Sequence, residues 1–209
     1  MKKLVCALAV LIPLSAQARE VREFERDFDA RDAERLVVDI PIGELSVQGS
    51  SGDAIEAKVS IDCRFRESRC RELAEDVDLV IRQRGSELVL ELEGIRSWKS
   101  LGLELEIEMK APARLALEVD FGVGELEIAG FENDITVDQG IGELNVRMDS
   151  STVDTVDIDA GIGDAMMRYP GGKLSTAGVF GNDLRWSDGS GSARVLLDLG
   201  IGEVDLRLK

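Results

Sequence analysis

A ten-residue segment that recurs five times constrains the fold of this chain more than any other feature. Each copy reads apolar, Asp, any residue, Gly or Pro, apolar, Gly, acidic, apolar, any residue, apolar. The copies begin at Val38, Val119, Val137, Ile158 and Leu197. Asp120, Asp138 and Asp159 are separated by 18 and then 21 residues, a period that fits the coil of a solenoid. A weaker sixth copy spans 176–184, where Gly181 replaces the acidic residue.

Apolar residues alternate with polar ones on both sides of the glycines, which indicates two short strands that meet at a Gly-x-Gly corner. Glycine suits a corner because the backbone there needs a positive φ angle or a close approach. The structural corner glycines of the four later copies are Gly122, Gly124, Gly140, Gly142, Gly161, Gly163, Gly200 and Gly202. The opposite corners hold loops at 130–133, 149–155, 170–173 and 187–192.

The predicted fold is therefore all-β, a single-stranded β-solenoid or β-helix with coils of about 18–22 residues. Fifteen of the 21 glycines lie in residues 115–209, which we take as the solenoid repeats. Residues 19–114 are predicted to form a strand-rich cap, continuous with the solenoid in one domain, with one short helix between Cys63 and Asp76 and a hairpin turn at Gly85-Ser86. Strands of the cap are expected at 21–28, 54–62, 77–83, 87–93 and 103–109.

Residues 1–18 have the layout of a cleavable secretory signal. Two lysines precede an apolar run, and the small residues Ala16 and Ala18 follow it. The run is too short for a transmembrane helix, and no later segment is long and apolar enough to be one. We expect a periplasmic, secreted or cell-surface protein that begins at Arg19.

The cysteines agree with export into an oxidising compartment. Cys6 lies inside the signal, so Cys63 and Cys70 would be the only cysteines left after cleavage. We predict that these two form a disulfide bond. A redox role is the less favoured alternative, because their spacing is not that of a Cys-x-x-Cys motif.

Composition excludes several functional classes. The chain has 41 acidic and 25 basic residues, a formal net charge of -16 and no histidine. Histidine general bases, Ser-His triads and His-ligated metals are therefore impossible. The acidic balance opposes binding to nucleic acid or anionic lipid. We expect no cofactor, no catalytic residues and no enzymatic activity. The alternative is a carbohydrate-active enzyme on a solenoid, although no pair of carboxylates stands out among so many.

Stacked coils would align equivalent side chains in columns about 4.8 Å apart. One acidic column would contain the candidate metal ligands Glu125, Glu143, Asp164 and Glu203, interrupted by Gly181; a second would contain Asp120, Asp138, Asp159 and Asp198. Two compensations for the repulsion are open. Calcium could bind the hard oxygen ligands of a cation-dependent adhesin. We favour Asx-type turns at the aspartates, with arginine pairing and solvent screening elsewhere, because the Gly-Gly-x-Gly-x-Asp calcium motif is absent.

Other residues are candidates for ligand contact. A basic column of Arg147, Arg168, Arg185 and Arg207 could bind an anionic polymer, and Trp98 could stack on a sugar. A column of Met148, Tyr169, Trp186 and Leu208 is expected to extend the core. The last strand, 203–209, would end the stack, so its open edge is a candidate surface for self-association.

The predicted elements follow one another in a distinctive order. The early copy at 38–47 comes first, then the helix, the strands Val77-Asp-Leu-Val-Ile81 and Glu87-Leu-Val-Leu-Glu91, and finally the later coils. It resembles a bacterial family of exported domains of unknown function that carry the label adhesin. The resemblance implies a β-solenoid with a strand-rich N-terminal portion. That family mostly has Gly-Asp-Val or Gly-Asp-Ile where this chain has Gly-Glu-Leu, a longer carboxylate arm. We expect a scaffold or binding module of the envelope whose partner is an envelope protein or a glycan.

Overall fold

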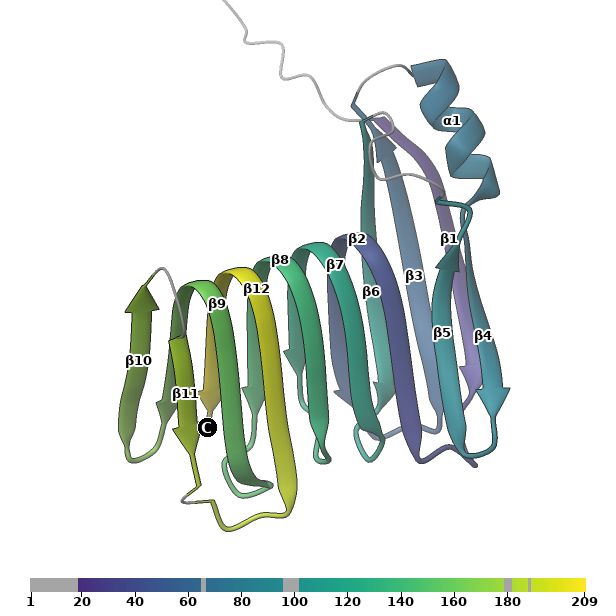
Figure 1. Cartoon of the computed structure of the whole chain (residues 1–209). Coiled ribbons are helices and arrows are strands. Elements are labelled where there is room, and N and C mark those ends of the chain that lie inside the picture. The colour runs from purple at the N-terminus through teal and green to yellow at the C-terminus, as the bar shows by residue number, and fades with distance from the viewer. Residues whose placement is uncertain (1–18, 65–66, 96–101, 179–181, 188) are drawn as a thin grey trace, which may run out of the picture.

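The computed structural model describes residues 19–64, 67–95, 102–178, 182–187 and 189–209. The proposed signal, residues 1–18, lies outside this part. The described residues form twelve strands in one open, mixed sheet, together with one short helix (Figure 1). The all-β prediction and the single short helix are confirmed. The elements are β1 (Arg19–Asp29), β2 (Arg35–Ser50), β3 (Ala54–Cys63), α1 (Glu67–Asp76), β4 (Asp78–Arg84), β5 (Glu87–Glu93), β6 (Leu103–Pro112), β7 (Ala116–Ala129), β8 (Ile135–Met148), β9 (Val153–Tyr169), β10 (Gly172–Gly178), β11 (Asn182–Trp186) and β12 (Ala193–Leu208).

The five copies of the repeat form the five long strands β2, β7, β8, β12 and β9. These strands lie side by side, parallel and in register, and each bends over at its glycines (Figure 1). The bend does not interrupt the strand, so each copy is one continuous strand and not two short strands as predicted. Apolar residues before and after the bend point into the space that the bend encloses, and there they form the core.

Close backbone packing explains why the corners need glycine. Gly124 has a φ angle of +144°, and a Cβ atom added to it would lie 1.8 Å from the carbonyl oxygen of Gly43 on the neighbouring strand. No side chain fits at that distance. The same close approach recurs from strand to strand at Gly142, Gly163 and Gly202. The predicted structural role of these glycines follows from the close contact between strands as well as from the positive φ angle.

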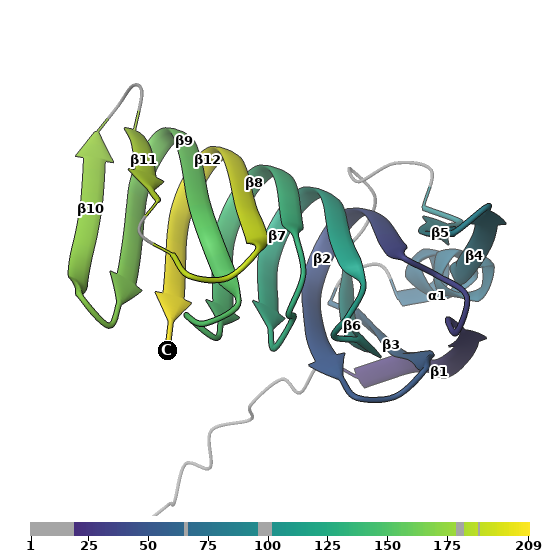
Figure 2. The same cartoon turned by 90° about the horizontal axis from the view of Figure 1, so that it is seen from below.

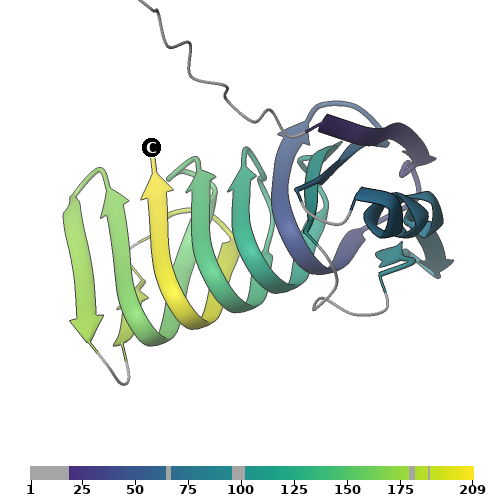
Figure 3. The ribbon, with the colours of Figure 1, turned by 90° about the horizontal axis from the view of Figure 1, so that it is seen from above.

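The order of the strands differs from the predicted order. β12 lies between β8 and β9, so Asp198 pairs with Asp138 on one side and Asp159 on the other. Figure 3 shows this strand, in yellow, between green neighbours. The structure is therefore a mixed sheet and not a solenoid whose coils stack in chain order. The proposed self-association through an open edge at 203–209 is wrong, because both edges of β12 are paired.

The sixth copy also has a different structure from the one predicted. Its two parts belong to β10 and β11, which both run antiparallel to β9 and pair with its two halves. Gly178 lies opposite Gly163, and Asn182 lies opposite Ala160. Gly181 itself falls outside the described residues. The end of the sheet is thus β10, not the last strand of the sequence.

The N-terminal strands extend the other end of the sheet. β2 pairs with β5 along its first half and with β6 along its second half. β6 continues through β3 to β1 in antiparallel order, and β4 forms a hairpin with β5 at Gly85-Ser86. Figure 2 shows α1, β4 and β5 together at this end of the molecule. The strands and the hairpin predicted for residues 19–114 are confirmed.

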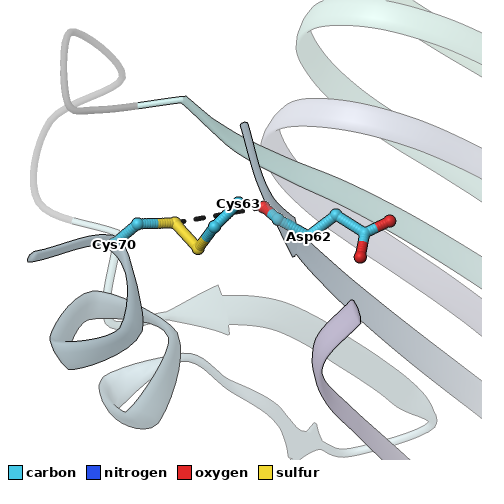
Figure 4. The surroundings of a disulfide bond; sticks show 3 residues. All are labelled: Asp62, Cys63 and Cys70. Atoms are coloured by element: carbon cyan, nitrogen blue, oxygen red, sulfur yellow. Dashed lines mark hydrogen bonds between the residues drawn. A yellow bond between two sulfur atoms is a disulfide. The ribbon is translucent and has the colours of Figure 1, made fainter. Parts of the chain in front are cut away.

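A disulfide bond joins the end of β3 to α1. Cys63 and Cys70 are bonded, with their Cα atoms 6.0 Å apart, as predicted (Figure 4). Cys70 is fully buried. The other end of α1 is held by Arg22, whose guanidinium donates hydrogen bonds to the carbonyl oxygens of Ala74 at 2.7 Å and Val77 at 2.6 Å. These contacts satisfy carbonyls that have no partner within the helix.

The large residues near the strand ends extend the core, but they do not all form the predicted column. Met148, Leu208 and Tyr169 end neighbouring long strands, whereas Trp186 lies opposite Val156 on the other half of β9, because β11 is reversed. Met148 and Leu208 are buried. Tyr169 and Trp186 are partly buried against the core, with their ring centroids 5.7 Å apart. These residues are therefore part of the packing and not a free binding platform.

Candidate functional site

Register across the long strands arranges the outward side chains in rows. The residue between the two corner positions of each strand is Ile or Val, and it points outward at the bend. We call this row the ridge: Ile42, Val123, Ile141, Ile201 and Ile162, in spatial order. The last four are 40–47% exposed. Large aliphatic side chains with this exposure in one continuous row are unusual on a protein surface.

An aspartate row runs along one side of the ridge. It comprises Asp39, Asp120, Asp138, Asp198 and Asp159, and Asp183 of β11 continues it. Partial burial raises the pKa of Asp120, and the charges of Asp39 and Asp138 raise it further. Partial burial likewise raises the pKa of Asp198, with added repulsion from Asp138 and Asp159. The side chains therefore repel one another.

The expected Asx-type turns do not form at these aspartates. Among the described residues, no side chain of the five long-strand members of the row accepts a hydrogen bond or forms an ion pair. The backbone N–H groups that such turns would use are paired across the sheet instead, because the strand continues through the bend.

A glutamate row runs along the other side of the ridge. It consists of Glu44, Glu125, Glu143, Glu203 and Asp164. The structure brings together the four candidate metal ligands of the sequence, and β12 places Glu203 between Glu143 and Asp164. No group of three or more acidic or cysteine side chains in the described part of the chain converges as a metal site would require. No ion pair reaches this row in that part of the chain either.

Outward carboxylates two residues C-terminal to the glutamate row do have basic partners. Arg147 contacts Glu127 at 2.6 Å. Asp205 accepts hydrogen bonds from Arg168 at 2.7 Å and from Arg207 at 2.9 Å. Partial burial would raise the pKa of Asp205, but the two arginines outweigh it and hold the pKa below its ordinary value. The predicted pairing of carboxylates with arginines is correct here.

The candidate ligand contacts are only partly brought together. Arg147, Arg207 and Arg168 are neighbours in one row, which Lys173 of β10 continues. Arg185 is not in this row. It lies on the other half of the strands, where it pairs with Asp157 at 3.2 Å, because β11 runs in the opposite direction to the one predicted. Trp98 lies outside the described residues.

Two shallow depressions accompany these rows. A groove of about 590 Å³ lies over β1, β3, β6 and β2, with Glu25, Glu56, Lys58, Glu108 and Lys110 in its lining. A smaller one of about 390 Å³ lies where the bends of β2 and β7 meet β3 and β6. Both are open, the larger lined mostly by charged side chains and the smaller by charged and apolar ones together, unlike the enclosed apolar pockets that hold small ligands.

Sequence reasoning missed the ridge itself. Its signal was present, because the residue between the corner positions is Ile or Val in all five copies. If side chains alternated between inward and outward without interruption through the corner, these residues would point into the core. The bend shifts the alternation, so Phe121 and Leu126 both point inward while Val123, between them, points outward.

The fold and these rows define a class of protein: a mixed β-sheet that displays equivalent side chains on in-register strands. Residues 16–168 match the family described as the N-terminal domain of toast_rack, DUF2154, and the chain belongs to this family. The match ends within β9, so β10, β11 and β12 lie entirely beyond it. No curated protein matches the sequence.

Solved structures are similar to this chain at low sequence identity. A "putative cell adhesion protein" from Clostridium sporogenes ATCC 15579 is 15% identical with a TM-score of 0.55, covering 91% of this chain and 100% of that chain. A "putative lipid binding protein" from Parabacteroides distasonis ATCC 8503 is 12% identical with a TM-score of 0.38, covering 88% and 61%. A "putative adhesin" from Bacteroides fragilis NCTC 9343 is 11% identical with a TM-score of 0.32, covering 90% and 97%.

No helix among the described residues is long and apolar enough to cross a bilayer.

Proposed function

We propose that this protein is an exported, non-enzymatic binding module of the bacterial envelope. The observation that carries the proposal is the register of the five bent strands. It repeats an aliphatic side chain and two acidic ones on all five strands, and a basic one on β8, β12 and β9, at a fixed spacing of about 4.8 Å along the stack. A partner that meets several members of a row at once gains affinity from many weak contacts.

Three further features support a binding role over catalysis. The chain lacks histidine, its depressions are open, and the outward carboxylates are equivalent members of rows. A glycosidase instead needs one acid and one base in different environments. The signal-like residues 1–18 and the disulfide bond support export to the periplasm or the cell surface.

The test is binding of the purified protein to intact envelope preparations and to a glycan array, alongside a screen for product release from polysaccharides. We expect saturable binding that weakens with salt, and no soluble product. Product release that is lost in a Glu125→Gln/Glu143→Gln variant would show an enzyme instead. Failure to bind any envelope fraction or glycan would refute the binding role.

A further inference from the structure

The ridge carries aliphatic side chains where the fold does not require them. The bend determines that the residue between the corner positions points outward, but it does not determine what that residue is. Threonine is β-branched like Val and Ile and would suit the same extended backbone. All five positions are nevertheless Ile or Val, and four are 40–47% exposed. A continuous exposed apolar row of this kind marks an interaction surface.

The charges around the ridge indicate what would bind there. The aspartate row lies on one side and the glutamate row on the other, ten carboxylates on the five long strands. In contrast to Glu127 and Asp205, none of the ten has a basic partner among the described residues. Cations on both sides of an apolar stripe would complement this surface.

The dimensions of the surface fit one α-helix. Five strands about 4.8 Å apart give a ridge about 19 Å long, which equals the length of a helix of about 13 residues. The aspartate and glutamate rows are five residues apart along each strand. They are therefore at most about 17 Å apart across the bend. A helix with side chains is about 10–12 Å wide, so lysine or arginine on its two flanks would reach both rows.

From these observations, and resting on the proposed binding function, we infer that the ridge and its two acidic rows are a docking surface for a cationic amphipathic helix of a partner protein. An aliphatic stripe of that helix packs on the ridge. Lysine and arginine side chains on both sides of the stripe pair with the aspartate and glutamate rows, and the repulsion within each row decreases.

Charge argues against two other occupants. A second copy of this chain would bring the same acidic rows to the ridge, and like charges would face each other. An anionic membrane surface would repel the ten carboxylates. Both remain measurable outcomes of the experiment below.

The probe is a helical peptide of about 14 residues with a leucine stripe and lysines on both flanks of the stripe. Two control peptides have glutamate in place of lysine, or the same residues in an order that breaks the stripe. Fluorescence anisotropy with the full-length protein should show binding of the first peptide at least about tenfold tighter than of either control, and weaker binding at higher salt. Equal binding of the three peptides would overturn the proposal.

Variants locate the binding surface. Ile141→Thr/Ile201→Thr should weaken peptide binding about tenfold or more. Leu196→Thr is the matched control, because Leu196 is also 45% exposed but lies outside the ridge; its affinity should change less than about twofold. Asp138→Asn/Glu143→Gln should weaken binding and reduce its salt dependence. Thermal melting identifies any variant that has lost its fold.

Three results would contradict the assignment. Ridge and control variants could bind the peptide equally well; the protein could bind anionic vesicles and not the peptide; or concentration-dependent dimerisation could be abolished by the ridge variant. If the peptide fails while the wild type still binds envelope fractions, the ridge assignment is wrong and the binding function stands.

Discussion

Asp198 and Asp138 lie directly beside each other on the parallel strands β12 and β8, although they come from distant parts of the sequence. Asp159 lies on the other side of Asp198. The pKa of Asp198 is raised by partial burial and by both neighbours. A like-charged row in the middle of a sheet reduces its stability.

Replacing Asp198 by asparagine should therefore raise the free energy of unfolding at pH 7 by a few tenths to about 1 kcal/mol. Folding raises the pKa of this carboxyl, so the destabilisation is complete above the raised pKa and fades as the pH falls toward the ordinary value of 3.8. Urea unfolding at pH 7 and pH 4 measures the difference. An Asn variant less stable than wild type at pH 7 would contradict the repulsion.

Asp205→Asn should instead lower the free energy of unfolding in the same urea assay. Hydrogen bonds from Arg207 and Arg168 hold the pKa of Asp205 below 3.8 in spite of its partial burial. The stabilisation is thus present above pH 3.8 and is lost as the pH falls through the folded-state pKa. We expect a loss of about 1 kcal/mol at pH 7, since the Asp205 side chain is 24% exposed. A neutral or stabilising substitution would mean that the arginine contacts contribute nothing.

Gly124→Ala should be among the most destabilising single substitutions, costing about 3 kcal/mol or more. The added methyl group would clash with the Gly43 carbonyl, as well as force alanine to a positive φ angle. Gly85→Ala is the control, because Gly85 also has a positive φ of +67° but open space around it; it should cost about 1 kcal/mol. Equal losses in chemical unfolding would show that close packing at the bend is unimportant.

Removal of the disulfide bond by Cys63→Ala/Cys70→Ala should lower the free energy of unfolding by roughly 2–3 kcal/mol. The bond joins only β3 and α1, so hydrogen exchange should increase in α1 and leave β7 and β8 nearly unchanged. Reduction of the wild type should reproduce the pattern. Equal loss of protection in β8 would show that the bond supports the whole sheet.

Calcium should not raise the melting temperature beyond the effect of sodium chloride at equal ionic strength. The carboxylates of each row repeat along the stack and do not converge in groups of three or more in the described residues. Melting with calcium, with a chelator and with matched salt measures this directly. A calcium-specific increase would show a ligand of the folded state and would favour the cation-dependent adhesin.

The strands and corners of this fold were predictable because they depend on local pattern. Alternation located β1, β3, β4, β5 and β6 to within a few residues, and the repeat located the five long strands. The disulfide bond followed from the number of cysteines and their expected compartment. The acidic rows followed from register alone, because equal motifs align in parallel strands.

The order of the strands was not predictable, and the reason is the repeat itself. Copies with the same alternation and the same corner fit beside one another in any order, so the sequence does not distinguish a last strand at the edge from a last strand in the middle. The strand direction of the sixth copy was not predictable either, because a short alternating segment can pair with its neighbour in parallel or antiparallel orientation. That reversal moved Arg185 away from the other arginines.

The central position of β12 has a consequence for how the protein is made. The neighbouring edges of β8 and β9 stay without their final partner until residues 193–208 have been synthesised. A nascent chain that has reached only β11 therefore cannot yet assume its finished architecture. Under the export proposed above, this delay would favour completion of the sheet only after the chain has crossed the membrane.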